Sequence, residues 1–162
     1  GWLNQQYLKN DDPEAVAKHL VWHLEQAGYD LSRGPKPADL VIALRERAQT
    51  LKEMAEKSAV WFGPLNDYDD AAGAKHLTGA ERGPLTDGRE RVAALEAWNA
   101  DAVGDALKAT SEALGIGMGK IAQPVRVAIT GSQVSPDISQ TVYLAGREEA
   151  LARIDAALAK IA

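Results

Sequence analysis

The sequence predicts an all-α protein with two helical lobes, and three observations support this. Alanine is abundant, aromatic residues make up 6% and charged residues 25% of the 162 residues, a composition that favours helices over aromatic and β-branched strands. Apolar residues recur at helical spacing in most segments. Capping residues or prolines precede these segments and glycines follow several of them, which is typical of helix ends. A chain of this length is sufficient for two small lobes.

The first predicted helix begins at Asp12-Pro13 and ends at Gly28. The Asp12 carboxylate can cap the free N–H groups, and Pro13 suits the first helical position because its missing N–H would be unpaired there anyway. The apolar side chains that define the buried face recur every three or four residues: Val16, Leu20, Leu24 and Ala27.

Two further helices follow the Gly- and Pro-rich loop at residues 33–37. The first begins at Pro37 or Ala38 and carries Leu40, Val41 and Leu44 on one face. The second is predicted over about residues 51–61, because Thr50 and Glu53 have the spacing of a capping box. Arg45 and Arg47 then lie near a helix end, where long side chains can reach a partner.

Residues 63–88 are rich in Gly, Asp and Pro and contain one short helical candidate at about 70–77. We place the boundary between the lobes here, giving lobes at residues 1–76 and 77–162. Residues 90–98 and 99–114 each carry an apolar stripe and resemble two antiparallel helices, the second of which ends at Gly115.

Residues 119–130 are ambiguous, because Val125–Ile129 favours a strand whereas Ile121, Val125 and Ala128 keep helical spacing. Ser135-Pro136 again has the pattern of an N-cap followed by a first helical residue, and Gly146 ends that helix. A last amphipathic helix follows, with Leu151, Ile154 and Leu158 on its apolar face.

Composition also limits the function. The chain has no cysteine, which excludes disulfides and cysteine-based metal sites. Its apolar runs are far shorter than the ~20 residues of a membrane span, and the N-terminus does not resemble a signal peptide, so we expect a cytoplasmic protein.

The net charge of −5 argues against binding nucleic acid over the whole surface. However, no acidic residue stands between Glu112 and Asp137, a stretch that contains Lys120 and Arg126.

No catalytic or metal site is predicted. The glycines before Lys120 lack the GxxxxGK[ST] spacing of a phosphate-binding loop, and Ile121 replaces the hydroxyl residue. His19 and His23 have the spacing of a zinc-binding helix, but the glutamate that serves as the base there is missing. Without cysteine the remaining nucleophiles are Ser and Thr, and none lies in a GxSxG elbow. We therefore expect no catalytic residue, no metal ligand and no cofactor.

What remains is Arg126 with Gln123, next to Ser135-Pro136. Arginine and glutamine side chains can make paired, planar hydrogen bonds to base edges. Single-stranded RNA loops are the usual targets of such recognition because their bases are unstacked. The residues themselves thus indicate an RNA-binding function, with a plain surface arginine as the alternative.

Four strings in this sequence carry a resemblance to a known family: WLNQQYL at residues 2–8, ADLV at 38–41, ERAQTLKEM at 46–54 and GMGKIAQPVRVAITG at 117–131. Together they closely resemble the C-terminal part of bacterial glutamyl-tRNA synthetase. The match continues through Ser135-Pro136 to the last helix and spans nearly the whole chain in order.

The resemblance implies an α-helix cage in which the first lobe lies toward the anticodon stem of the glutamate tRNA and the second reads the anticodon loop. It also implies that residues 120–129 are helical, with Arg126 directed toward the anticodon. The glycines of residues 115–119 would then shape a turn between helices.

Site residues follow from the same resemblance. Arg126 matches the arginine that contacts an anticodon base, and Ser135, Pro136 and Ile138 match residues that pack around the bases. Lys120 and Gln123 belong to the same segment. Arg47 matches the arginine with which some members inspect the third anticodon base, so that glutamate and glutamine anticodons are distinguished; Arg45 is the competing candidate at this position.

The HIGH-like and KMSKS-like signatures of the family's catalytic half do not occur here. We therefore expect a fragment, excised or naturally free-standing, that neither activates glutamate nor binds ATP. The parent enzyme would use ATP and Mg²⁺. The expected partners are the glutamate tRNA and the missing N-terminal catalytic half, with no membrane, no DNA and a monomeric state. The alternative function is that of a helical protein-interaction module without RNA binding.

Overall fold

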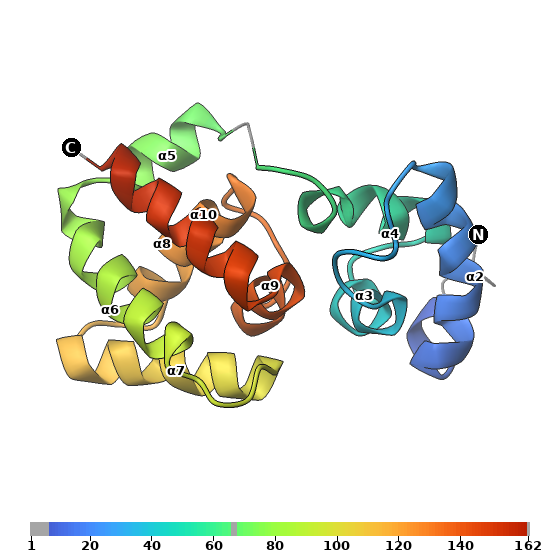
Figure 1. The fold of residues 1–162 in the computed structure, drawn as a ribbon, viewed down its shortest axis with the longest axis horizontal. Coiled ribbons are helices and arrows are strands. Elements are labelled where there is room, and N and C mark those ends of the chain that lie inside the picture. Colours follow the sequence, from blue (N-terminus) through green and yellow to red (C-terminus); the bar gives the residue numbers. More distant parts are fainter. Residues whose placement is uncertain (1–6, 66–67, 162) are drawn as a thin grey trace. The chain divides into compact units, whose positions relative to one another are not determined.

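The computed structural model describes residues 7–65 and 68–161, so residues 2–6 of the first resemblance string lie outside the described part. The chain divides into two compact units, Gly1–Pro64 and Leu65–Ala162, which we describe separately. Every regular element within the described ranges is an α-helix or a short 3₁₀ helix, so the all-α prediction is confirmed (Figure 1). None of the helices in this part of the chain is long and apolar enough to cross a membrane.

The first unit is built from α2 (Pro13–Gln26), α3 (Pro37–Leu44), α4 (Leu51–Lys57) and the 3₁₀ helix η1 (Ala59–Trp61). As predicted, Asp12 caps α2: its carboxylate accepts a hydrogen bond from the Ala15 N–H at 3.3 Å. α2 packs against both α3 and α4. Three residues of the apolar face predicted for α2, Val16, Leu20 and Leu24, are fully buried and form the core side of this helix. The fourth, Ala27, is the exposed C-cap and does not join the core.

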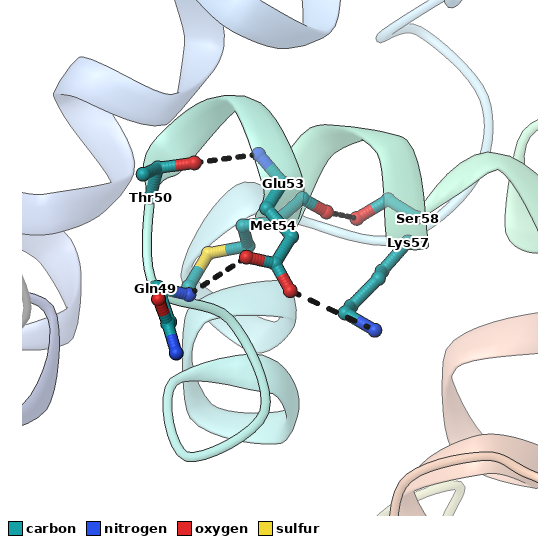
Figure 2. Close-up of polar contacts among 6 residues, drawn as sticks. All are labelled: Gln49, Thr50, Glu53, Met54, Lys57 and Ser58. Atoms are coloured by element: carbon teal, nitrogen blue, oxygen red, sulfur yellow. Dashed lines mark hydrogen bonds and ion pairs between the residues drawn. The ribbon is translucent and has the colours of Figure 1, made fainter.

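The start of α4 is held by a set of polar contacts (Figure 2). The Thr50 hydroxyl oxygen accepts from the Glu53 N–H at 3.0 Å, as the capping-box spacing predicts. The Glu53 carboxylate accepts from the N–H of Gln49 at 3.1 Å and lies 3.9 Å from the Lys57 ammonium. Its return contact thus reaches the residue before the N-cap, which ties the end of the preceding loop to α4.

The predicted third helix is interrupted before residue 61. The Ser58 hydroxyl donates to the Met54 carbonyl oxygen at 2.8 Å (Figure 2), and the chain then tightens into η1. A hydroxyl that bonds back to the carbonyl four residues earlier competes with the helical pattern, which sequence periodicity does not register.

Gly34 packs against an aromatic pair in the first unit. The rings of Tyr29 and Phe62 stack at 4.8 Å with 3° between their planes, and the Tyr29 hydroxyl donates to the Ala55 carbonyl oxygen. A Cβ added at Gly34 would lie 2.9 Å from two Phe62 ring carbons. The backbone φ of Gly34 is +78°, a value that other residues rarely adopt. Both space and backbone therefore require glycine here.

We predict that Gly34→Ala destabilises the first unit more than Gly28→Ala does. Gly28 also has a positive φ, +85°, but nothing lies within 4 Å of an added Cβ, so this control isolates the backbone cost of ~1–2 kcal/mol. Gly34→Ala should add about 1–3 kcal/mol for the clash with the stacked ring. Urea denaturation of the two variants measures the difference, and equal losses would contradict the packing argument.

The second unit contains α5 (Asp70–His76), the 3₁₀ helix η2 (Gly79–Glu81), α6 (Arg82–Ala93), α7 (Ala100–Leu114), α8 (Gly119–Thr130), α9 (Ile138–Ala145) and α10 (Arg147–Lys160). α8 contacts α5, α6, α7, α9 and α10, and Figure 1 shows α10 lying across α8 and α9. Residues 119–130 are thus a helix in the middle of this unit, which decides the ambiguity left by their periodicity.

The sequence predicts a helix over residues 90–98. The helix found there, α6, instead begins at Arg82 and ends at Ala93. Pro84 lies in its first turn, where proline is tolerated, and Gly88 lies where a Cβ would be 3.5 Å from the Leu107 side chain of α7. Pro84 is thus tolerated in the first turn of α6, and Gly88 allows α6 to pack closely on α7, so neither residue breaks the helix. Trp98 lies outside the helix, and its indole N–H donates to the Tyr143 carbonyl oxygen at 3.1 Å.

The division between the units falls at Pro64/Leu65, whereas the sequence places the lobe boundary between residues 76 and 77. The reason is that α5 packs on α8. In addition, the Asp69 N–H, directly before α5, donates to the Gly131 carbonyl oxygen at 2.8 Å. These contacts link α5 to segments more than 40 residues later, and composition alone does not reveal them.

Candidate nucleic-acid interface

One face of α8 carries the polar residues that the sequence singles out. Lys120, Gln123 and Arg126 are three residues apart and therefore share a face. Lys120 is exposed, and the other two side chains are half-buried. The remaining side of the helix is buried in the core of the second unit, with Ile121, Val125, Ala128 and Ile129.

The C-terminal end of α8 is fixed by a buried arginine that sequence analysis missed. Arg153 is only 4% exposed; its guanidinium donates to the Ile129 carbonyl oxygen at 2.7 Å and to the Glu149 carboxylate at 2.9 Å. Gly131 then ends the helix in a left-handed conformation. The sequence offered one sign of this role, a basic residue on the apolar face of the last helix. A charge buried there requires hydrogen-bond or ion-pair partners.

Arg126 and Ser135 are brought together as expected. The Arg126 Nε–H donates to the Ser135 hydroxyl oxygen at 2.6 Å. That oxygen also lies 2.8 Å from the Pro136 carbonyl oxygen and 2.9 Å from the Thr141 hydroxyl. Thr141 is fully buried and lies 2.9 Å from the same Pro136 carbonyl. This network holds the Nε side of the guanidinium against the loop before α9.

The predicted helix start at Ser135-Pro136 is wrong. α9 begins at Ile138, and its N-cap is Asp137, whose carboxylate accepts from the Ser139 N–H at 3.1 Å. Pro136 is buried, and Ile138 is 6% exposed and belongs to the core. Because the Ser135 hydroxyl bonds to Arg126 and Thr141, it is not available as the cap. Ser135 therefore orients the arginine, while Pro136 and Ile138 present little area to a ligand.

Val134 is a surface residue that sequence analysis did not select. Its side chain is 72% exposed, although the loop around it is well tied. The Val134 N–H donates to the Ser132 hydroxyl oxygen at 3.1 Å, and the preceding Gln133 carboxamide lies 3.1 Å from the His76 imidazole. An apolar residue in an otherwise polar loop beside Ser135 was the signal that the sequence offered.

The two arginine candidates of the first unit have different environments. Arg45 is half-buried, and its guanidinium donates to the carbonyl oxygens of Leu8 and Asp11. It thus holds the N-terminal segment to the end of α3. Arg47 is exposed, and its backbone N–H donates to the Leu44 carbonyl oxygen at 2.8 Å. Of the two, Arg47 is the side chain that the structure leaves at the surface.

Metal-ligating side chains do not gather in the described residues. No cluster of three His, Cys, Asp or Glu that would hold a metal ion occurs among them. His19 and His23 instead contact aromatic rings edge-on: His19 lies 5.7 Å from Tyr7, and His23 lies 4.9 Å from Trp22. The arrangement on α8 is suited to binding.

A family model described as an anticodon binding domain matches residues 8–158. The chain belongs to this family. Among curated relatives, the glutamate–tRNA ligase of Xylella fastidiosa strain M23 is 62% identical over 161 residues, which are 99% of this chain and 34% of the relative. That of Stenotrophomonas maltophilia strain R551-3 is 59% identical over 162 residues, 100% of this chain and 35% of the relative. The resemblance stated from the sequence is confirmed.

Solved structures with the same fold include a glutamate tRNA ligase from Elizabethkingia meningosepticum, crystallised in complex with its amino acid. It superposes with a TM-score of 0.84 at 24% identity and covers 98% of this chain and 31% of that protein. A glutamate-tRNA synthetase from Elizabethkingia anophelis gives 0.80 at 24% identity, over 98% of this chain and 30% of that one. The anticodon-binding chain described here thus spans about a third of the length of the proteins it matches.

Replacing Arg153 should loosen the end of α8. We predict that Arg153→Met lowers the free energy of unfolding by about 1–3 kcal/mol, because the buried Ile129 carbonyl loses its donor. The control is Arg89→Met. Arg89 pairs with Asp155 of the same helix α10 through two hydrogen bonds at 2.8 and 3.1 Å, but at the surface, where such a pair contributes ~0–1 kcal/mol. Chemical denaturation compares the two; equal losses would contradict a structural role for Arg153.

Proposed function

We propose that this chain recognises the anticodon stem-loop of a glutamate tRNA as part of a glutamate–tRNA ligase. The observation that carries the proposal is the Arg126 guanidinium held by the Ser135 hydroxyl at 2.6 Å, on the polar face of the central helix of an anticodon-binding domain. A guanidinium held on one edge by the protein keeps its orientation, which a planar contact to a base requires.

The charge distribution supports this placement. An RNA loop is a polyanion, and the segment between Glu112 and Asp137 offers it Lys120 and Arg126 with no acidic side chain in the sequence between them. Lys120 is exposed and suits a phosphate, whereas Arg126 with its fixed edge suits a base. The net charge of −5 is compatible with this because a few base contacts, not a basic surface, provide the selectivity.

The first unit contributes Arg47 in this proposal. The side chain is exposed, and the loop that carries it is tied to α4 through Gln49 and Glu53 (Figure 2). We assign it to the third anticodon base, so that it separates glutamate from glutamine anticodons, and assign the first unit to the stem side of the anticodon arm. Gln123 completes the surface around the loop bases, and we assign Pro136 and Ile138, which are buried, a supporting role in place of base contact.

The rest of the proposal concerns the whole protein, of which this chain is about a third by comparison with its relatives. The complete enzyme would join glutamate to its tRNA with ATP and Mg²⁺ in the cytoplasm, as a monomer, using a catalytic part that lies outside this chain. The chain itself supplies recognition and carries no catalytic residue in this scheme.

Binding to a hairpin RNA of about 17 nucleotides tests the proposal, with the glutamate anticodon in one hairpin and a changed third anticodon base in another. We expect tighter binding to the first. Arg126→Ala should weaken that binding by roughly 5- to 150-fold, the equivalent of one paired arginine–base contact. Arg47→Ala should instead remove the preference between the two hairpins.

Arg33→Ala is the matched control, because this arginine is 87% exposed and is not among the residues that we assign to the anticodon. Measurements at two salt concentrations separate phosphate contacts, which weaken with salt, from base contacts. If the folded chain bound both hairpins equally, or if Arg126→Ala behaved like the control, the anticodon proposal would fail and a protein-interaction module would become the better explanation.

A further inference from the structure

The chain between α8 and α9 begins with residues 131–135, which we call the Ser135 loop because it carries the hydroxyl that holds Arg126. Part of its bonding is local. The Thr130 hydroxyl oxygen accepts from the Ser132 N–H at 3.1 Å, and the hydroxyl donates to the Arg126 carbonyl oxygen at 2.8 Å. These bonds join close neighbours in the sequence, so they shape the loop at the end of α8.

Two further bonds reach the Ser135 loop from α5, a segment more than 50 residues earlier. The Asp69 N–H donates to the Gly131 carbonyl oxygen at 2.8 Å, and the His76 Nε2 lies 3.1 Å from the side-chain carbonyl oxygen of Gln133. A carbonyl oxygen can only accept, so in this bond the imidazole carries its hydrogen on Nε2. Asp69 is the N-cap of α5 and His76 its last residue. The two ends of α5 therefore support two places in the Ser135 loop.

α5 can act as a support because it is itself fixed in the second unit. A helix of seven residues has little stability of its own. However, Ala72 is fully buried, and Leu77, directly after the helix, packs against the core. The Asp69 carboxylate also accepts from the Ala72 N–H at 3.0 Å, which caps the helix. Core packing and capping together hold α5 in place.

Tyr68, directly before α5, adds a second attachment to the helix that carries Arg126. Its hydroxyl donates to the Ala128 carbonyl oxygen of α8 at 3.4 Å. The Lys160 ammonium of α10 lies 4.8 Å from the centre of the Tyr68 ring, a distance at which a cation is attracted to an aromatic face. The support and the arginine are thus attached to the same helix.

A continuous series of contacts leads from His76 to Arg126. His76 holds Gln133, which stands two residues before Ser135, and the Ser135 hydroxyl accepts from the Arg126 Nε–H at 2.6 Å. If the imidazole bond were lost, the Gly131 attachment would remain on one side, and the Gln133 side of the loop would be free to shift. A small shift matters because the strength of a hydrogen bond falls steeply with distance and angle.

We propose that His76 is a positioning residue for anticodon recognition. Through Gln133 it holds the Ser135 loop where the Ser135 hydroxyl keeps the Arg126 guanidinium oriented for its base. His76 itself contacts no base in this scheme. The inference rests on the proposed function, since it assigns a residue of α5 to the same RNA contact.

NMR of the full chain without RNA tests the positioning step directly. We expect the Arg126 Nε–H resonance, assigned by its loss in Arg126→Ala, to shift or broaden in His76→Phe, which keeps a ring but removes the N–H donor. His76→Gln should restore the signal, because its amide places a donor at a similar reach. His19→Phe, the same substitution at an exposed histidine of the first unit, is the matched control. An unmoved signal in His76→Phe would overturn the inference.

Hairpin binding tests the consequence for RNA. His76→Phe should weaken the glutamate hairpin about two- to tenfold, the equivalent of one net hydrogen bond. Gln133→Met removes the acceptor of the same bond and should have the same effect, and the double variant should lose no more than either single one. This second variant also tests the bond independently if His76→Phe folds poorly.

The same measurement in an Arg126→Ala background distinguishes positioning from a general structural effect. There, His76→Phe should cause no further loss of affinity, because no guanidinium remains to be oriented. A loss of the same size in both backgrounds would show that His76 acts on the fold as a whole and would refute the positioning role.

Together the two experiments separate this inference from the proposed function. If the hairpin binds in an Arg126-dependent manner but His76→Phe behaves like His19→Phe, the inference fails and anticodon recognition stands. If the Arg126 signal moves in His76→Phe and returns in His76→Gln but no hairpin binds, the support of Arg126 by His76 stands and the anticodon proposal fails.

Discussion

The burial of one side of α8 is the constraint on which the second unit depends. Its apolar residues contribute to a core shared with α6, α7, α9 and α10, and α5 also contacts α8. A helix packed in this way has little freedom to rotate or slide. Its opposite face is therefore presented in a fixed orientation. Lys120, Gln123 and Arg126 owe their position on one exposed side of the helix to this packing.

A polar network complements that packing at the C-terminal end of α8. Arg153 binds the Ile129 carbonyl from α10, and Ser135 and Thr141 hold Arg126 from the side of α9. These bonds lie where a hydrophobic core alone would leave backbone carbonyls and a guanidinium unpaired. The same groups thus contribute to stability and set the direction of the side chain that we assign to base recognition.

Much of the fold was predictable because local chemistry agrees with tertiary structure. Asp12-Pro13, Thr50 with Glu53, and Gly115 mark helix ends in the sequence and do so in the structure. The errors arose where tertiary contacts override local signals. Gly88 allows close packing inside α6, and the Ser135 hydroxyl bonds to Arg126 and Thr141 instead of capping α9.

By itself, the sequence determined the helical class, the family through the string at residues 117–131, and the choice of Arg126 as the central candidate, because composition, capping and motifs are local properties. The family resemblance already implied a helix at residues 120–129, as found. Only the tertiary structure decided that this helix is central to its unit, and that Arg45 is occupied by backbone carbonyls while Arg47 is exposed. It alone revealed that His76 reaches Gln133 in the Ser135 loop. These features depend on side chains that are distant in the sequence and meet only after the helices pack, so no local pattern specifies them.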